Sequence, residues 1–248
     1  MRNTLRTVGA SKSFGGIRAL QEVSIEISEG AIIGLIGANG SGKTTLVHVV
    51  TGVLQPDSGQ VFLGDTDITG WRTDRIACQG IGRTFQVTRL FGTLSVVDNV
   101  ELGVMSTLKE KDVDGTVKHL LNRLKVDEWA SQGASILPYG VQRRVEIARA
   151  LGAHPRFLLL DEPAAGLNEE ESHELLEMIY GISKDPDFGC GVLIIDHNPR
   201  LILRLCERIC VLDKGRVLAE GTPQEIRSNP KVIEAYLGES YASAKGGQ

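Results

Sequence analysis

The chain contains few cysteines and no long apolar run, and each of these features argues against a class of protein. Its four cysteines among 248 residues have neither metal-ligand nor redox spacing, so we expect buried free thiols in a reducing compartment. Apolar runs such as residues 192–195 are too short to cross a bilayer. Residues 1–5 show no apolar core of a signal peptide, which favours a cytoplasmic location. The net charge of −4, without a basic block, gives no reason to expect nucleic-acid binding.

Residues 37–45 read Gly-Ala-Asn-Gly-Ser-Gly-Lys-Thr-Thr and stand between an apolar run and a helical pattern. This strand, glycine loop and helix context predicts a phosphate site. Glycines allow successive backbone N–H groups to converge on anionic oxygens, and the helix N-terminus adds partial positive charge. Lys43 is then expected to reach the β- and γ-phosphates, and Thr44 to place its hydroxyl on Mg²⁺. A glycine-rich turn with a chance lysine is the alternative, and it leaves the full pattern unexplained.

Strands and helices alternate along most of the remaining chain. Apolar residues at 23, 25 and 27 indicate a half-buried strand, and Gly15-Gly16 predicts a hairpin before it. Buried strands are expected at 157–160 and 192–195, and a strand pair with two short helices at 209–237. This order predicts a doubly wound α/β sheet that binds its ligand at the carboxyl ends of the strands.

Between residues 88 and 150 the pattern becomes helical. Ser95, with Asp98 three residues on, is typical of a helix N-cap, and residues 109–115 read as a charged loop. A further helix is expected at 141–151. We interpret this region as a helical subdomain inserted into a single domain that spans 1–248, with a flexible tail at 238–248.

Two carboxylates, Asp161 and Glu162, follow the first of the buried strands. Asp161 is placed as a Mg²⁺ partner of Thr44, and Glu162 as the group that orients or deprotonates an attacking water. Adjacent carboxylates can also cap a helix or turn, but Pro163 and the upstream phosphate loop argue against that role here. His197 ends the neighbouring strand and is predicted to contact the γ-phosphate, the alternative being an ordinary core or surface histidine.

These motifs, in this order, resemble the nucleotide-binding subunit of an ABC transporter over nearly the whole chain. The resemblance implies an α/β P-loop NTPase of ABC type, with a mixed central sheet, an N-terminal antiparallel β part and the inserted helices. It also implies ATP hydrolysis, with Glu162, His197 and Lys43 as catalytic residues. In the phosphate loop the implied ATP contacts are Asn39, Gly40, Ser41, Gly42, Lys43, Thr44 and Thr45.

Other residues acquire roles by the same resemblance. Gln86, in Gly-Arg-Thr-Phe-Gln at 82–86, looks like the Q-loop glutamine, which would join Thr44 and Asp161 around Mg²⁺ and face the membrane subunits. Phe14 matches the aromatic residue that stacks on adenine, ordinary core packing being the alternative. Asn168, in the D-loop at 165–168, departs from the aspartate of the general family.

Residues 82–86, 142–151, 161–168 and 235–239 are similar to the ATPases of branched-chain amino-acid importers. The resemblance implies transmembrane permease subunits, a second ATP-binding subunit and, indirectly, a solute-binding protein as partners. It places the chain at the cytoplasmic face of the inner membrane, as a peripheral subunit.

The signature loop departs from the family's Leu-Ser-x-Gly-Gln and reads Leu-Pro-Tyr-Gly-Val at 137–141. By resemblance, Pro138 and Gly140 belong to the loop that caps ATP on the facing subunit. Proline removes a hydroxyl and a backbone N–H, and each hydrogen bond to a charged group contributes about 1.5–3 kcal/mol. We therefore expect an impaired site on the facing subunit, which favours a heterodimer with a sister ATPase over a homodimer.

Four alternatives stay open from sequence. The transported solute can be urea, an amide or another small molecule, and the transporter can be an exporter. A soluble ABC ATPase of DNA repair or translation normally has two cassettes or long coiled coils. A nucleotide-sensing subunit with little hydrolysis conflicts with the intact Glu162, and a small-molecule kinase with the helical insertion.

Overall fold

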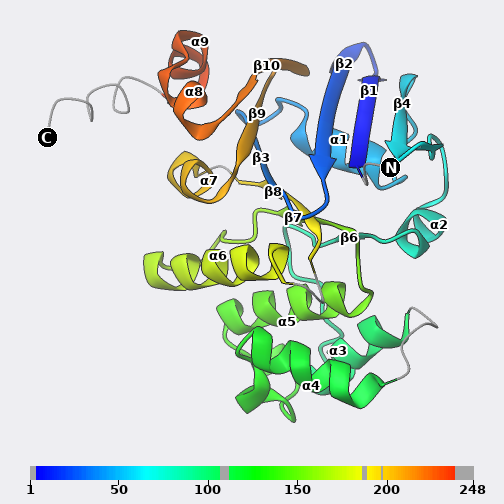
Figure 1. Ribbon diagram of the computed structural model, residues 1–248, viewed down its shortest axis with the longest axis vertical. Coiled ribbons are helices and arrows are strands. Elements are labelled where there is room, and N and C mark those ends of the chain that lie inside the picture. Colours follow the sequence, from blue (N-terminus) through cyan, green and yellow to red (C-terminus); the bar gives the residue numbers. More distant parts are fainter. Residues whose placement is uncertain (1–3, 107–111, 186–188, 197, 238–248) are drawn as a thin grey trace, which may run out of the picture.

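The structure is a computed structural model, and it describes residues 4–106, 112–185, 189–196 and 198–237 (Figure 1). Its strands are β1 (Thr4–Phe14), β2 (Ile17–Ser28), β3 (Ile32–Ile36), β4 (Ser58–Leu63), β5 (Thr66–Asp67), β6 (Ile81–Arg83), β7 (Phe157–Asp161), β8 (Gly191–Ile195), β9 (Arg208–Asp213) and β10 (Arg216–Gly221). Its α-helices are α1 (Lys43–Val50), α2 (Thr73–Cys78), α3 (Val96–Met105), α4 (Val113–Arg123), α5 (Tyr139–Gly152), α6 (Glu169–Ser183), α7 (Pro199–Leu205), α8 (Pro223–Ser228) and α9 (Pro230–Val232). Short helical turns are η1 (Asp127–Trp129), η2 (Ala134–Ile136) and η3 (Ile233–Leu237).

The strands form two sheets. An antiparallel sheet has the order β2-β1-β4-β5, and a six-stranded sheet has the order β10-β9-β3-β8-β7-β6. Pairing in the larger sheet is parallel from β9 to β6, and β10 joins as an antiparallel edge strand. The mixed central sheet and the N-terminal antiparallel part confirm the predicted fold class.

Strand β7 shows how the larger sheet is buried on both faces. Leu158 and Leu160 pack into one core with the helices α3 to α7, whereas Phe157 and Leu159 pack into a second core. The second core includes α1 and the antiparallel sheet. A strand covered on both faces must be apolar throughout, so polar residues with a function can stand only at its ends.

The helices α3, α4 and α5 lie at the lower end of the molecule in Figure 1, opposite the antiparallel sheet. The predicted N-cap is confirmed: the Ser95 side chain accepts from Asp98 N–H, and Asp98 in turn accepts from Ser95. The prediction of a loop at 109–115 is wrong for its last residues. Asp112 accepts a hydrogen bond from Gly115 N–H, and α4 starts at Val113. Residues 107–111 lie outside the described residues, as does the predicted tail at 238–248.

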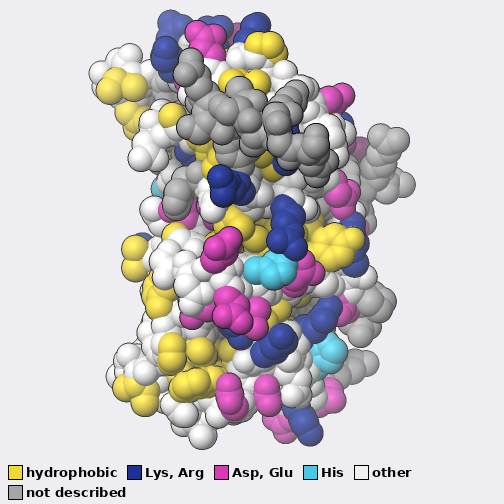
Figure 2. Space-filling view, turned by 90° about the vertical axis from the view of Figure 1, so that its left-hand side faces the viewer, with side chains coloured by type: hydrophobic (Ala, Val, Ile, Leu, Met, Phe, Trp, Pro, Cys, Tyr) yellow, Lys and Arg dark blue, Asp and Glu magenta, His cyan; other side chains and the backbone are white. Residues whose placement is uncertain are grey.

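Charged side chains of both signs are mixed on the face that carries α6 and α7 (Figure 2). On these helices Arg204 lies 4.0 Å from a carboxylate oxygen of Glu177. Among the described helices none is both long and apolar enough to cross a bilayer. Three of the cysteines are buried, as expected, but Cys78 is exposed at the end of α2.

Candidate active site

The phosphate loop runs from the end of β3 to the start of α1 and packs tightly at two of its glycines. A Cβ atom on Gly37 would lie 2.2 Å from the carbonyl oxygen of Leu212. Gly42 has φ 108°, and its Cβ would lie 2.4 Å from the carbonyl oxygen of Ala19. Gly40 also has a positive φ, but no described atom lies within 4 Å of its Cβ position. The loop is therefore fixed against β2 and β9 at its ends and open at its centre.

Lys43, the first residue of α1, points back into this loop. Its Nζ donates to the carbonyl oxygens of Gly37 at 2.8 Å and Ala38 at 3.0 Å. Burial lowers the pKa of Lys43, while the nearby charges of Glu162 and Asp161 raise it. A desolvated ammonium group gains free energy from an anionic partner, which a phosphate group would supply.

The other predicted phosphate-loop residues differ in exposure. Asn39, Gly40 and Thr44 are exposed, whereas Ser41 is buried. The Ser41 carbonyl oxygen accepts a hydrogen bond of 2.9 Å from Gly215 N–H, which ties the loop to the turn between β9 and β10. The exposed residues thus form the accessible part of a loop whose base is held by distant parts of the chain.

Asp161 and Glu162 stand at the carboxyl end of β7. Asp161 pairs with Ile195 in the sheet and is only 7% exposed. Burial raises its pKa, as does the charge of Glu162, while Arg83 and Lys43 lower it. Glu162 has a φ of 46°, in the left-handed region that β-carbon sterics disfavour, and its N–H donates to Ile195 at 2.7 Å.

Gln86 is brought to this strand end although it lies far from it in sequence. Its Nε2 donates to Glu162 Oε2 at 3.0 Å, and Gln86 itself is exposed. The structure therefore brings Gln86 into contact with Glu162. Glu162 and Asp161 also lie near enough to Lys43 for their charges to raise its pKa against the effect of burial. An amide, two carboxylates and a lysine beside an open glycine loop form an arrangement suited to phosphoryl chemistry.

Two buried charges on α5, which our sequence reasoning missed as site residues, hold the segment around Gln86. Arg143 is 1% exposed and donates from its guanidinium to the carbonyl oxygens of Phe85, at 2.6 Å, and Gln86. Glu146, 2% exposed, lies 3.2 Å from Arg143 and accepts from Arg89 N–H at 3.2 Å. Their signal in sequence is the presence of an i, i+3 charge pair on the apolar face of a helix.

The signature loop at 137–141 forms the N-terminus of α5, which begins at Tyr139 rather than near Val141. Pro138 is the N-cap residue and supplies no side-chain hydrogen bond to the described first turn. Pro138 and Tyr139 are exposed, but Gly140 is buried, and a Cβ on it would lie 3.4 Å from Leu167. The helix N-terminus is thus presented to the outside through Pro138 and Tyr139.

The remaining predicted site residues lie apart or outside the described residues. Phe14 ends β1 beside the hairpin turn, is 45% exposed and lies with its ring 5.8 Å from Lys12 Nζ. His197 is not among the described residues. Its neighbour Asp196 is buried at the end of β8, where it accepts a hydrogen bond from Asn198 N–H.

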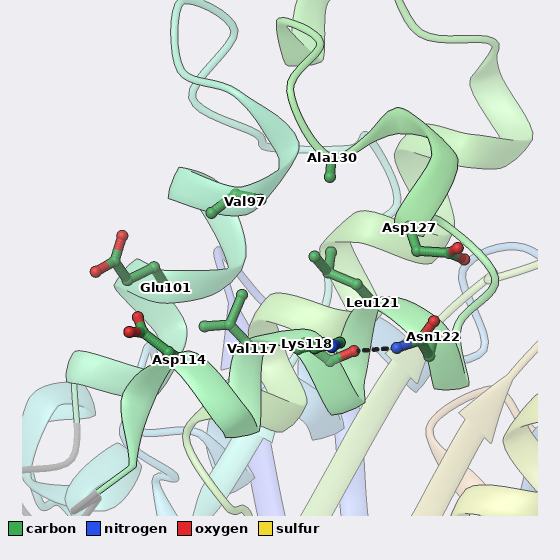
Figure 3. Close-up of a pocket in the computed structure, with 9 residues that line it drawn as sticks. All are labelled: Val97, Glu101, Asp114, Val117, Lys118, Leu121, Asn122, Asp127 and Ala130. Carbon is green, nitrogen blue, oxygen red and sulfur yellow. Dashed lines mark hydrogen bonds between the residues drawn. The ribbon is translucent and has the colours of Figure 1, made fainter.

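A separate cavity of about 410 Å³ lies among α3, α4 and η1 (Figure 3). Its centre is apolar, and the carboxylates of Glu101 and Asp114 lie together at one end. In another part of the wall, the Asn122 side chain donates a hydrogen bond from Nδ2 to the carbonyl oxygen of Lys118, at 2.8 Å. All lining residues come from 97–130, so this cavity is distinct from the phosphate loop.

Comparison with known proteins gives consistent matches. The profile of a family described as ABC transporter matches residues 20–165, and that of a branched-chain amino acid ATP-binding cassette transporter matches 216–242. The chain is 37% identical to the high-affinity branched-chain amino acid transport ATP-binding protein BraF of Pseudomonas aeruginosa, over 96% of this chain and 99% of the relative. It is 36% identical to the lipopolysaccharide export system ATP-binding protein LptB of Escherichia coli, over 96% and 98%. The ADP conformation of MJ1267, an ATP-binding cassette of an ABC transporter, superposes with a TM-score of 0.84 at 32% identity, covering 96% and 99%.

Proposed function

The chain belongs to the ABC transporter family, and from this premise we propose that it is the ATP-hydrolysing subunit of an importer of branched-chain amino acids. Members of this family bind nucleotide and couple ATP hydrolysis to transport. The observation that carries the choice of solute is the match of residues 216–242 to the branched-chain family, together with full-length relatives of that function. In this proposal the chain is one ATPase domain, with the helices of 88–150 as its inserted subdomain.

ATP is held, in this proposal, by the glycine loop and Phe14. The loop is open at Gly40, and Asn39 and Thr44 are exposed beside it, which leaves room for phosphate oxygens. Lys43 exchanges its bonds to the loop carbonyls for bonds to the β- and γ-phosphates, since these compensate its desolvated charge better than neutral oxygens do. Ser41, Gly42 and Thr45 complete the loop.

The donor set also fits Mg²⁺, which prefers oxygen ligands. We propose that the Thr44 hydroxyl, the Gln86 amide oxygen and the Asp161 carboxylate hold it. The raised pKa of Asp161 supports this role, because a buried carboxylate beside a second one is stabilised in its charged form by a cation. The ion would neutralise developing charge on the phosphates.

We assign hydrolysis to Glu162, with His197 at the γ-phosphate. Glu162 is held by Gln86 at 3.0 Å, and its backbone is fixed to β8. As general base or water-orienting group it should contribute about 10²- to 10⁴-fold to turnover. A Glu162→Gln variant should therefore bind ATP with unchanged affinity and lose at least about 100-fold in turnover.

The matched control is Glu177→Gln, since Glu177 is 63% exposed on α6. The two variants are compared in nucleotide affinity and in phosphate release by the assembled complex. If Glu162→Gln turned over like the control, the chain would be a nucleotide-sensing subunit instead of a hydrolase.

The proposed partners are two permease subunits, a second ATPase and, indirectly, a solute-binding protein, with the chain at the cytoplasmic face of the inner membrane. Pro138 supports a heterodimer, because it presents neither a hydroxyl nor an N–H at the exposed start of α5. Pro138→Ser should restore these donors and raise turnover at the facing site about tenfold. Unchanged turnover in the heterodimer, or equal turnover by the homodimer alone, would refute this assignment.

A second candidate, an exporter ATPase, is favoured by the 36% identity to the lipopolysaccharide export protein. Reconstitution with the membrane subunits distinguishes the two. Import predicts ATP turnover that rises with a leucine-loaded binding protein outside the vesicle, and export predicts no response to it.

A further inference from the structure

Asp57 holds the end of β1 from the side of β4. Its Oδ2 accepts a hydrogen bond from Ser13 N–H at 2.7 Å, and its Oδ1 accepts one from Lys12 Nζ at 2.7 Å. Its own N–H donates to the carbonyl oxygen of Ser11 at 2.8 Å. One residue of the turn at 55–57 therefore contacts three successive residues of a neighbouring strand. The hydrogen bonds from Lys12 and Ser13 lower the pKa of Asp57 below that of an ordinary aspartate.

Among the described residues, the end of β1 has no strand partner on the side of β4. Pairing between β1 and β4 ends at Ser11 and Ser58, whereas β1 continues to Phe14. On the other side β1 pairs with β2 as far as Phe14 and Ile17, with register shifts on both sides of Lys12. The Asp57 carboxylate takes the place of the next strand residue by accepting the Ser13 N–H, which would otherwise face solvent on this edge.

Phe14 follows directly after the residues that Asp57 holds. Its side chain is 45% exposed, so the surrounding core does not fix the ring. The same hairpin reaches the phosphate loop, since Ala19 on β2 touches Gly42 closely enough to exclude a Cβ atom. The direction in which β1 ends thus sets the position of the Phe14 ring relative to the phosphate loop.

We propose that Asp57 is a positioning residue for nucleotide binding, which orders the end of β1 so that Phe14 meets the adenine base. This inference rests on the proposed function, in which Phe14 stacks on adenine. A stacking surface that is already ordered loses little conformational entropy when the base binds, whereas a frayed strand end must be ordered at the expense of affinity. In this proposal Asp57 acts on the nucleotide indirectly, through the backbone of Ser13 and the side chain of Lys12.

The test compares the affinities of the purified chain for Mg-ATP and for magnesium tripolyphosphate, which has no base. Phe14→Ala should weaken ATP binding about tenfold and leave tripolyphosphate binding unchanged. Asp57→Ala should weaken ATP binding about three- to tenfold, again without affecting tripolyphosphate. Asp57→Asn keeps an acceptor for Ser13 N–H and loses the ion pair. Its affinity for ATP should lie between those of Asp57→Ala and the unmodified chain.

Asp67→Ala is the matched control. Asp67 lies in the same sheet and accepts hydrogen bonds from Gln60 and Thr69 instead of from β1. In the Phe14→Ala background, Asp57→Ala should cause no further loss. The inference is overturned if Asp57→Ala weakens ATP binding no more than Asp67→Ala, weakens tripolyphosphate binding equally, or adds fully to Phe14→Ala. If Phe14→Ala itself leaves ATP affinity unchanged, the adenine contact in the proposed function is wrong, and the inference falls with it.

Discussion

Replacing Arg143 by methionine tests the contact between α5 and the segment around Gln86. The guanidinium is 1% exposed, lies 3.2 Å from Glu146 and donates to the carbonyl oxygens of Phe85 and Gln86. Methionine keeps much of the side-chain volume and removes the charge and every hydrogen bond. Glu146, 2% exposed, then loses the guanidinium that lies 3.2 Å away.

The expected loss follows from this burial. Breaking a buried ion pair by removing one partner costs about 3–5 kcal/mol in the free energy of unfolding. A chain of this length loses about 2–4 °C in Tm per kcal/mol, so Arg143→Met should lower Tm by about 10 °C. Arg144→Met is the control, because Arg144 pairs with Glu174 at a partly exposed site and such pairs contribute about 0–1 kcal/mol.

Thermal unfolding of the two variants measures the difference, and a double variant separates stability from function. Arg143→Met with Glu146→Leu removes both members of the buried ion pair and should regain most of the lost stability. ATP turnover should stay low in the double variant, since neither new side chain holds the Gln86 segment that contacts Glu162. Equal unfolding temperatures for Arg143→Met and Arg144→Met would refute a stabilising role of the buried ion pair.

Two further predictions follow from pKa shifts. Burial and Glu162 raise the pKa of Asp161, so its carboxylate takes up a proton at a higher pH than an ordinary aspartate. Mg-dependent ATP affinity should therefore begin to fall with decreasing pH above the usual aspartate range, and titration calorimetry on Asp161→Asn should show this pH dependence removed. Burial also raises the pKa of the Cys190 and Cys210 thiols to about 12, and it raises the pKa of the Cys206 thiol as well. Alkylation of the native chain at pH 8, followed by mass spectrometry, should therefore modify Cys78 alone.

The fold was predictable because its signals are local. Capping residues such as Ser95, the glycine loop and the continuous apolar strand before Asp161 each determine a short segment through nearby atoms. The start of α4 was predicted wrongly for the same reason. Its N-cap, Asp112, stood in a charged stretch that reads as a loop, and only its hydrogen bond to Gly115 distinguishes the two.

The site was predictable only in part, because its geometry depends on contacts between distant segments. The residue types and the order of Lys43, Gln86 and Glu162 indicate phosphate chemistry. That Gln86 donates to Glu162, however, depends on how the segment after β6 lies against β7. The roles of Arg143 and Glu146 were hidden because a charged pair on a helix is ordinarily a solvated one.

The proposed site depends on the phosphate loop itself and on the segment around Gln86 that faces it. Its own Lys43 and Thr44 are set by local sequence, but the groups opposite them are set by α5, which holds the Gln86 segment through Arg143. The same helix carries Pro138 at its exposed N-terminus. Pro138 at the start of α5 and Arg143 within it belong to one continuous helix, and Arg143 donates to the carbonyl oxygens of Phe85 and Gln86. In the proposed heterodimer, α5 would therefore connect the site that Pro138 is proposed to face with Glu162, the proposed general base, through Gln86.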